Sequence, residues 1–265
     1  MKTEKVSEFI VNWLKNYAQE NKISGFVIGI SGGIDSAVTS ALCAKTGLKV
    51  LCLEMPIKQN DEHVSRAKNH IQNLKLNYKN VSSELIDLNS VFISFCKEVN
   101  SEKYSLKNEL ALANSRARLR MTTLYYYAGM NNYLVVGTGN KVEDFGVGFY
   151  TKYGDGGVDL SPIANLLKSE VVELGKYLEV SELIIRAKPS DGLYEDSRSD
   201  EDQLGATYNE LEWAMRFEDN NTITENEFKS REKKVLEIYR SLNSKNKHKM
   251  TPIPICKIPN SLLKN

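Results

Sequence analysis

Apolar positions along the chain follow two different periodicities. Between Val6 and Gln19 they recur three or four residues apart, which is typical of a helix with one buried face. Short continuous apolar runs, typical of buried strands, follow at Phe26–Ile30, Val50–Met55 and Leu134–Thr138, with a weaker candidate at Leu85–Leu88. Helical segments separate these runs. The pattern therefore predicts an α/β fold, a doubly wound and mostly parallel sheet with helices on both faces.

Three further helices are expected between or after these strands. Ala37–Ala44 consists of small and apolar residues that suit a helix packed on a sheet, and Asp61 is expected to cap a helix that runs to Leu74. The long aromatic segment Ser105–Met130 predicts another. With 265 residues, of which 41% are hydrophobic, the chain can bury one full core, so a single domain over residues 1–265 is expected.

The turn after the first strand carries the most informative motif, Ser31-Gly32-Gly33-Ile34-Asp35-Ser36. Its glycines let the backbone approach an anion closely, and the first turn of the following helix offers amide donors at a positive helix end. A phosphate chain suits this turn. An aspartate beside phosphates would repel them, so Asp35 indicates that Mg²⁺ accompanies the phosphates. The turn lacks both the Walker ending and the spacing of the dinucleotide-binding fingerprint.

Composition restricts the possible partners of the protein. The net charge of +1 argues against a general nucleic-acid binder. The N-terminus shows no signal-peptide pattern and no run approaches the length of a membrane span, so a cytoplasmic protein without membrane contact is expected. The four cysteines form no C-x-x-C pair, which favours reduced thiols over a zinc site or a disulfide framework.

Two later blocks of sequence lead to a known family. They read GTGNKVE at residues 137–143 and GFYTKYGDGGVDLSPIANLLKSE at residues 148–170. With SGGIDS they resemble the ammonia-dependent NAD synthetases of the ATP pyrophosphatase superfamily. Shorter matches lie at residues 114–121, 188–193 and 200–208 and at His248-Lys249, so the resemblance covers most of the chain. It implies a Rossmann-like fold with extra helical segments for dimerisation.

The resemblance implies a ligase that forms an amide bond. In that reaction the carboxylate of deamido-NAD attacks the α-phosphate of ATP, pyrophosphate leaves, and ammonia then displaces AMP to give NAD. Because two anions must meet, the site needs cations more than a nucleophilic side chain. The sequence shows no glutaminase part, so free ammonia is the expected nitrogen donor. The resemblance further implies a homodimer that interlocks through Ser105–Met130, with the active site at the interface.

The resemblance also implies roles for individual residues. Asp35 and Glu143 are expected to hold Mg²⁺, and with Lys152 they form the predicted catalytic set. The expected ATP-binding residues are Gly29, Ile30, Ser31, Gly32, Gly33, Ile34, Asp35, Ser36, Thr138, Lys168 and Ser190. The expected deamido-NAD-binding residues are Arg118, Lys152, Asp159, His248 and Lys249. Lys152 and Asp159 bracket a glycine-containing loop, which is expected to fold over the substrate and exclude water.

Two alternatives stay open. One is another SGGxDS adenylating enzyme, of the tRNA-modifying or GMP-forming type, and the other is an ATP-binding sensor without catalysis. A sensor has no reason to retain Lys152, Asp159 and the rest of the second-substrate residues. The chain departs from the family pattern at Lys141, in one residue added between Glu143 and Lys152, and at Arg198, and these departures bear on local loop geometry.

Overall fold

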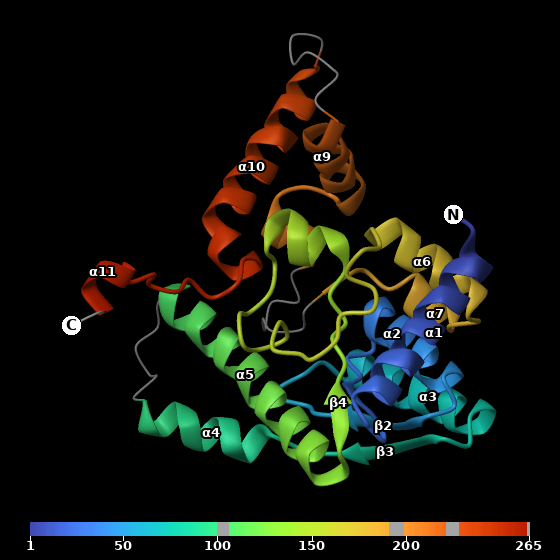
Figure 1. Cartoon of the computed structure of the whole chain (residues 1–265). Coiled ribbons are helices and arrows are strands. Elements are labelled where there is room, and N and C mark those ends of the chain that lie inside the picture. Colours follow the sequence, from blue (N-terminus) through green and yellow to red (C-terminus); the bar gives the residue numbers. More distant parts are fainter. Residues whose placement is uncertain (100–105, 191–198, 221–227, 264–265) are drawn as a thin grey trace.

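A parallel sheet lies between two layers of helices (Figure 1). The computed structural model describes residues 1–99, 106–190, 199–220 and 228–263. The four strands are β1 (Gly25–Gly29), β2 (Lys49–Glu54), β3 (Val81–Leu85) and β4 (Tyr133–Val135), in the order β3-β2-β1-β4. All neighbouring strands are parallel. The strand order reverses between β1 and β4, and such a reversal opens a crevice at the carboxyl ends of the strands.

Helices cover both faces of this sheet, as the sequence predicted. One face carries α1 (Thr3–Glu20), α2 (Ile34–Lys45), α3 (Asp61–Asn77), α6 (Lys168–Tyr177) and α7 (Glu182–Ile185), and the other carries α4 (Asn89–Glu98) and α5 (Leu106–Asn131). Successive side chains of β1 point to opposite faces of the sheet and so belong to different cores. Phe26 and Ile28 belong to the core beneath α1 and α2, whereas Val27 belongs to the core beneath α5. The doubly wound fold class is thus confirmed.

A smaller helical layer stands beside the sheet. It contains the π-helix η1 (Val142–Val147), α8 (Asp200–Leu204), α9 (Tyr208–Asn220) and α10 (Ser230–Met250), and α11 (Asn260–Leu263) follows. Leu211 and Met215 of α9 form a separate core with Val235 of α10, and Val142 and Val147 of η1 complete it. In Figure 1, α9 and α10 lie side by side away from the sheet. The π-helix therefore connects the sheet region to this second core.

Two strands differ from their predicted bounds. The third strand was expected at Leu85–Leu88 but covers Val81–Leu85. It lies at the edge of the sheet, where Leu85 remains 62% exposed, so it lacks the apolar run of a buried strand. β4 ends at Val135, earlier than the predicted Thr138, and the next residue makes only an isolated bridge, to Leu160.

Local features of two helices also differ. Asn60, not Asp61, caps α3, because its side chain accepts a hydrogen bond from the Glu62 backbone N–H at 2.9 Å. In α1, Phe9 belongs to the apolar pattern that predicted a buried helix face between Val6 and Gln19, but it is 73% exposed, whereas Ile10 is buried. None of the helices in the described ranges has the length and apolar character needed to cross a membrane. Ser105, the match at residues 191–193 and the departure at Arg198 lie outside the described residues.

Candidate active site

The turn from Ser31 to Ser36 leads from the carboxyl end of β1 into α2. Gly32 has a φ of 84°, and a Cβ there would lie 2.4 Å from the His63 carbonyl oxygen, so glycine alone fits this position. The hydroxyls of Ser31 and Ser36 are 3.1 Å apart, and the Gly33 N–H donates to Ser31 Oγ at 3.2 Å. Among the described residues, no side chain caps α2. Its first amide groups can therefore bind an anion.

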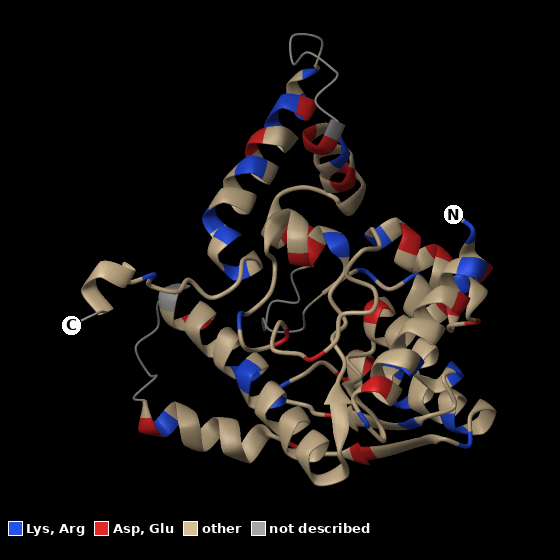
Figure 2. Cartoon of the chain, in the orientation of Figure 1, with Lys and Arg blue, Asp and Glu red and all other residues tan. Residues whose placement is uncertain are grey.

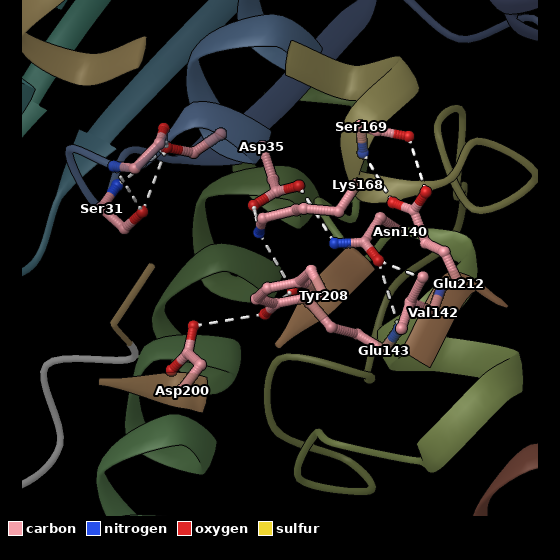
Figure 3. A network of polar contacts seen from close by, with 12 residues as sticks. Ser31, Asp35, Asn140, Val142, Glu143, Lys168, Ser169, Asp200, Tyr208 and Glu212 are labelled. Atoms are coloured by element: carbon pink, nitrogen blue, oxygen red, sulfur yellow. Dashed lines mark hydrogen bonds and ion pairs between the residues drawn. The ribbon is translucent and has the colours of Figure 1, made fainter. Parts of the chain in front are cut away.

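Two carboxylates meet one ammonium group beside this turn (Figure 3). Lys168 Nζ donates to Asp35 Oδ2 at 2.6 Å and to Glu143 Oε1 at 3.1 Å. The Asp35 and Glu143 side chains are 17% and 15% exposed and the Lys168 side chain is 8% exposed. Lys168 is the first residue of α6. The structure thus brings together three predicted site residues that come from α2, η1 and α6.

Burial shapes the electrostatics of this group. It raises the pKa of Asp35, and Glu143 adds to the rise, while Lys168 opposes it. Burial alone would lower the pKa of Lys168, but Asp35 and Glu143 outweigh it and hold that pKa above its usual range. Asp144 also lines the cavity, and burial, followed by the charges of Glu143 and Asp155, raises its pKa to about 8. Two carboxylates thus share one lysine, and a third acidic side chain beside them takes up a proton more readily than an ordinary aspartate.

Asn140 ties the two predicted metal ligands together. Its side-chain nitrogen donates to Asp35 Oδ1 at 3.2 Å, and its side-chain oxygen accepts from the backbone N–H groups of Val142 and Glu143. The residue is completely buried. Its amide therefore orients Asp35 and fixes the start of η1 at once. Asn140 lies within the GTGNKVE block, but no role was predicted for it.

Tyr208 and Glu212 extend the network from α9. The Tyr208 hydroxyl donates to Glu143 Oε1 at 2.6 Å, and its ring lies 4.7 Å from Lys168 Nζ. Glu212 is 4% exposed and accepts from the backbone N–H and the hydroxyl of Ser169, so it holds the first turn of α6 that carries Lys168. Tyr208 lies in the segment 200–208 that resembles the family, but the sequence predicted no role for it. Nothing in the sequence pattern distinguishes Glu212.

Asp35, Glu143 and Lys168 line a cavity of about 280 Å³ at the carboxyl ends of β1 and β4, whereas Asn140, Tyr208 and Glu212 support them from outside it. The predicted ATP-binding residues that line it are Gly29, Ile30, Ser31, Gly33, Ile34, Asp35, Ser36, Thr138, Lys168 and Ser190. Gly32 is not among them, because it faces α3. Basic side chains that were not predicted also line the cavity, namely His63, Arg66, Arg120 and Lys188. The cavity therefore combines backbone and basic donor groups with a pair of carboxylates.

Four of the predicted deamido-NAD-binding residues lie together outside this cavity. Arg118 donates to the Lys152 carbonyl oxygen at 3.3 Å, and Lys152 Nζ donates to the His248 carbonyl oxygen at 2.8 Å. Lys249 Nζ donates to the Tyr150 carbonyl oxygen at 2.7 Å. Tyr150 also lines the cavity, so it connects the two regions. In Figure 2, further Lys and Arg positions are coloured along the ribbon of α10, the helix that supplies His248 and Lys249.

Asp159 lies apart from this group. Its Oδ1 accepts from the Tyr125 hydroxyl at 3.0 Å, and its Oδ2 accepts from the Val135 N–H at 2.8 Å. Both carboxylate oxygens therefore have partners within the chain, at the end of β4. The Lys152–Asp159 loop contains three glycines in a tight succession of turns, and the Asp155 carboxylate accepts from the Thr151 N–H at 2.9 Å.

Comparisons with known proteins give the family. The family model described as NAD synthase matches residues 6–253. The chain is 41% identical over 210 residues to the NH(3)-dependent NAD(+) synthetase of Carboxydothermus hydrogenoformans, which covers 79% of this chain and 84% of that protein. The corresponding protein of Archaeoglobus fulgidus is 36% identical, covering 96% and 97%. The chain belongs to the NAD synthase family.

Solved structures agree with this assignment of the family. The structure of NMN synthetase from Francisella tularensis has a TM-score of 0.83 and 34% identity, covering 98% of this chain and 99% of that one. An NH3-dependent NAD synthetase from Campylobacter jejuni, in complex with the nitrate ion, has a TM-score of 0.78 and 28% identity, covering 97% and 100%. The comparisons confirm the predicted family and fold and the prediction of a ligase for NAD synthesis with ammonia. They favour neither of the two alternatives.

Proposed function

We propose that this cavity activates the carboxylate of deamido-NAD with ATP and passes it to ammonia, giving NAD, AMP and pyrophosphate. The observation that carries the proposal is the convergence of Asp35 and Glu143 on one cation beside the uncapped start of α2. Amide donors for a phosphate chain and carboxylates for a metal are thus adjacent. ATP with Mg²⁺ requires this combination of groups.

The donor set fits Mg²⁺. Two carboxylates approach the same Lys168 nitrogen atom within 3.1 Å, so the ammonium group occupies a position that suits a cation. Among the described residues, no group of three or more His, Cys, Asp and Glu side chains could hold a metal ion. Asp35 and Glu143 would therefore hold Mg²⁺ together with phosphate oxygens. When bound, Mg²⁺ neutralises charge on the phosphates of ATP.

The residues of the chain then have separate tasks. The amides of the turn and the Ser31 and Ser36 hydroxyls bind phosphates, and Lys168, released from the carboxylates, supplies a positive charge to them. The substrate carboxylate is itself the nucleophile, so binding and orientation are the contribution of the protein. Adenylation gives that carboxylate a good leaving group, AMP, which ammonia displaces. Exclusion of water protects the adenylate from hydrolysis.

The second substrate is proposed to bind at Arg118, Lys152, His248 and Lys249. This group lies outside the cavity, at the surface between α5 and α10, which supports the proposal that a second subunit completes the site in a homodimer. For Asp159 to bind the second substrate, the substrate must replace its hydrogen bonds with the Tyr125 hydroxyl and the Val135 N–H. The proposed function uses α2 and α10, from opposite ends of the chain, which supports one domain over residues 1–265. Its use of ATP agrees with the predicted cytoplasmic location.

A second candidate substrate is the mononucleotide acid that corresponds to NMN. The observation that favours it is the likeness to the Francisella tularensis NMN synthetase, at 34% identity over nearly the whole chain. The chemistry at the carboxylate is identical for both acids. The two differ in the adenylyl half, which deamido-NAD has and the mononucleotide acid lacks, and the proposed second-substrate residues lie outside the cavity. Discrimination therefore depends on the surface outside the cavity.

One experiment tests both proposals. The protein is incubated with ATP and Mg²⁺ in ammonium buffer, in three arms that contain deamido-NAD, the mononucleotide acid, or neither. In each arm we measure the formation of NAD or NMN and the release of AMP and pyrophosphate. We expect NAD and AMP in equal amounts with deamido-NAD, and loss of both products in Asp35→Ala and in the isosteric Asp35→Asn. Faster turnover of the mononucleotide acid would support the second candidate. Release of AMP without an acid substrate would contradict both.

A further inference from the structure

The end of η1 is held by side chains of α10 rather than by its own helical continuation. Asn243 Nδ2 donates to the Gly146 carbonyl oxygen at 2.7 Å, and Asn246 Nδ2 donates to the Val147 carbonyl oxygen at 2.8 Å. Residues three apart share one face of a helix, so both amides point toward η1. The last carbonyls of a helix lack partners within it, and here a distant helix supplies their donors.

The packing around these bonds leaves little room for replacement by water. Gly146, Val147 and Gly148 are all buried. Gly148 has a φ of 64°, and a Cβ at this position would lie 2.4 Å from Asn246 Cβ, so α10 packs directly on the backbone of the loop. A buried carbonyl that loses its donor in such a place is left without a partner, which costs more than the bond itself contributes.

The same backbone segment connects directly to Glu143. The N–H groups of Gly148 and Phe149 both donate to the Glu143 carbonyl oxygen, the second at 2.9 Å. A shift of residues 146–148 therefore moves the backbone of Glu143. From Glu143 the side chain reaches Lys168 and Tyr208. Hydrogen bonds, together with the covalent backbone of residues 146–149, thus link α10 to the proposed metal ligands.

We propose that Asn243 and Asn246 are positioning residues that hold η1 so that the Glu143 carboxylate stays beside Asp35. This inference rests on the proposed function for the consequence in catalysis, but the restraint itself concerns the protein without substrates. The two asparagines do not line the cavity and are not among the four residues of the proposed substrate cluster. They act through the backbone of η1, and Lys249 of the same helix also donates to the Gly148 carbonyl oxygen.

The test uses alanine and aspartate at each position. Asn243→Ala and Asn246→Ala remove the donor and improve helix propensity, so weakening of α10 itself cannot explain a loss. Asn243→Asp and Asn246→Asp keep the shape and remove the donor. Ser244→Ala is the matched control, because Ser244 lies between them on the exposed side of α10. Calorimetry measures the binding of a non-hydrolysable ATP analogue with Mg²⁺. Steady-state kinetics gives kcat and KM for ATP in the same variants.

We expect each asparagine variant to bind Mg²⁺ and the analogue roughly five- to tenfold more weakly, as loss of a hydrogen bond of ordinary strength predicts, with KM for ATP raised in step. Ser244→Ala should match the wild type. Wild-type affinity in the aspartate variants would overturn the proposal, because shape alone would then suffice. Unchanged affinity in both alanine variants would overturn it as well.

A second measurement separates this inference from the proposed function. Amide hydrogen exchange of residues 142–150 is compared in the protein without ligands, where no catalytic activity is required. Faster exchange in the asparagine variants and an unchanged rate in Ser244→Ala would support the restraint. Unchanged exchange in all variants would overturn it, whether or not the wild type makes NAD. Absence of NAD formation by the wild type would instead contradict the proposed function.

Discussion

Replacement of Lys168 by methionine tests the cation site most directly. Methionine keeps much of the volume and the apolar stem of lysine but removes the ammonium group that lies between Asp35 and Glu143. The two carboxylates then face each other with no compensating charge in their midst. We expect Lys168→Met to lose activity, because its charge is proposed to act on the phosphates, and to lose stability as well.

The size of the stability loss follows from the burial of the three side chains. Breaking a buried ion pair by removal of one partner costs roughly 3–5 kcal/mol. The exposures of 17% and 15% at Asp35 and Glu143 allow some hydration, so we expect a loss near the lower end, about 3 kcal/mol. Mg²⁺ should restore part of it. At a concentration a hundredfold above its dissociation constant, a ligand of the folded state adds about 2.7 kcal/mol.

The assay is urea unfolding of wild type and Lys168→Met in EDTA and over a series of Mg²⁺ concentrations at pH 8. Lys176→Met is the control, because this lysine is exposed in the last turn of the same helix and should change the free energy of unfolding by less than about 0.5 kcal/mol. Equal stability of Lys168→Met and wild type in EDTA would refute the reasoning about burial. A stabilisation by Mg²⁺ that is no larger in Lys168→Met than in wild type would refute the cation site.

Two further predictions concern a histidine of α3 that is buried against α2 and the tyrosine that bonds Glu143. Burial lowers the pKa of His70 to about 4, below the 6.5 of an unfolded chain, so the unfolded state binds the proton first as the pH falls. This contribution to stability is nearly complete at pH 7, and about 2 kcal/mol of it is lost between pH 7 and 5. His70→Gln should remove that part of the pH dependence in urea unfolding, and identical pH profiles of the two proteins would contradict the assignment. Tyr208→Phe should weaken calorimetric binding of an ATP analogue with Mg²⁺ roughly tenfold, because Glu143 loses a charge-assisted hydrogen bond while the ring over Lys168 remains. Wild-type affinity would show that Tyr208 does not orient Glu143.

Local sequence signals predicted the sheet and the phosphate turn because the responsible residues are consecutive. The apolar runs at β1 and β2 identified both strands within a residue of their ends, and the glycines of the turn between β1 and α2 indicated its shape. At β3 the same reasoning gave the wrong bounds. An edge strand is exposed on one side, so Val81–Leu85 has no continuous apolar run to reveal it.

Much of the site was beyond such reasoning because it depends on contacts between distant segments. Asn140 and Tyr208 lie within segments that resemble the family. Their roles depend on hydrogen bonds to Asp35 and Glu143, which come from other parts of the chain. Glu212 has no local signal, since a glutamate in a helix is usually a solvated surface residue. Lys168 was expected through the family resemblance, whereas its burial between two carboxylates is a property of the folded chain.

The distribution of the site along the sequence has a consequence for synthesis of the protein on the ribosome. A nascent chain that has reached Val135 contains all four strands and the phosphate turn, so the parallel sheet can begin to assemble. Lys168 and Tyr208 are made later, and α10 later still. The growing polypeptide therefore carries the glycine turn after β1 well before it has the groups that complete the polar network around Asp35. That network can close only late in translation, after Tyr208 has been made.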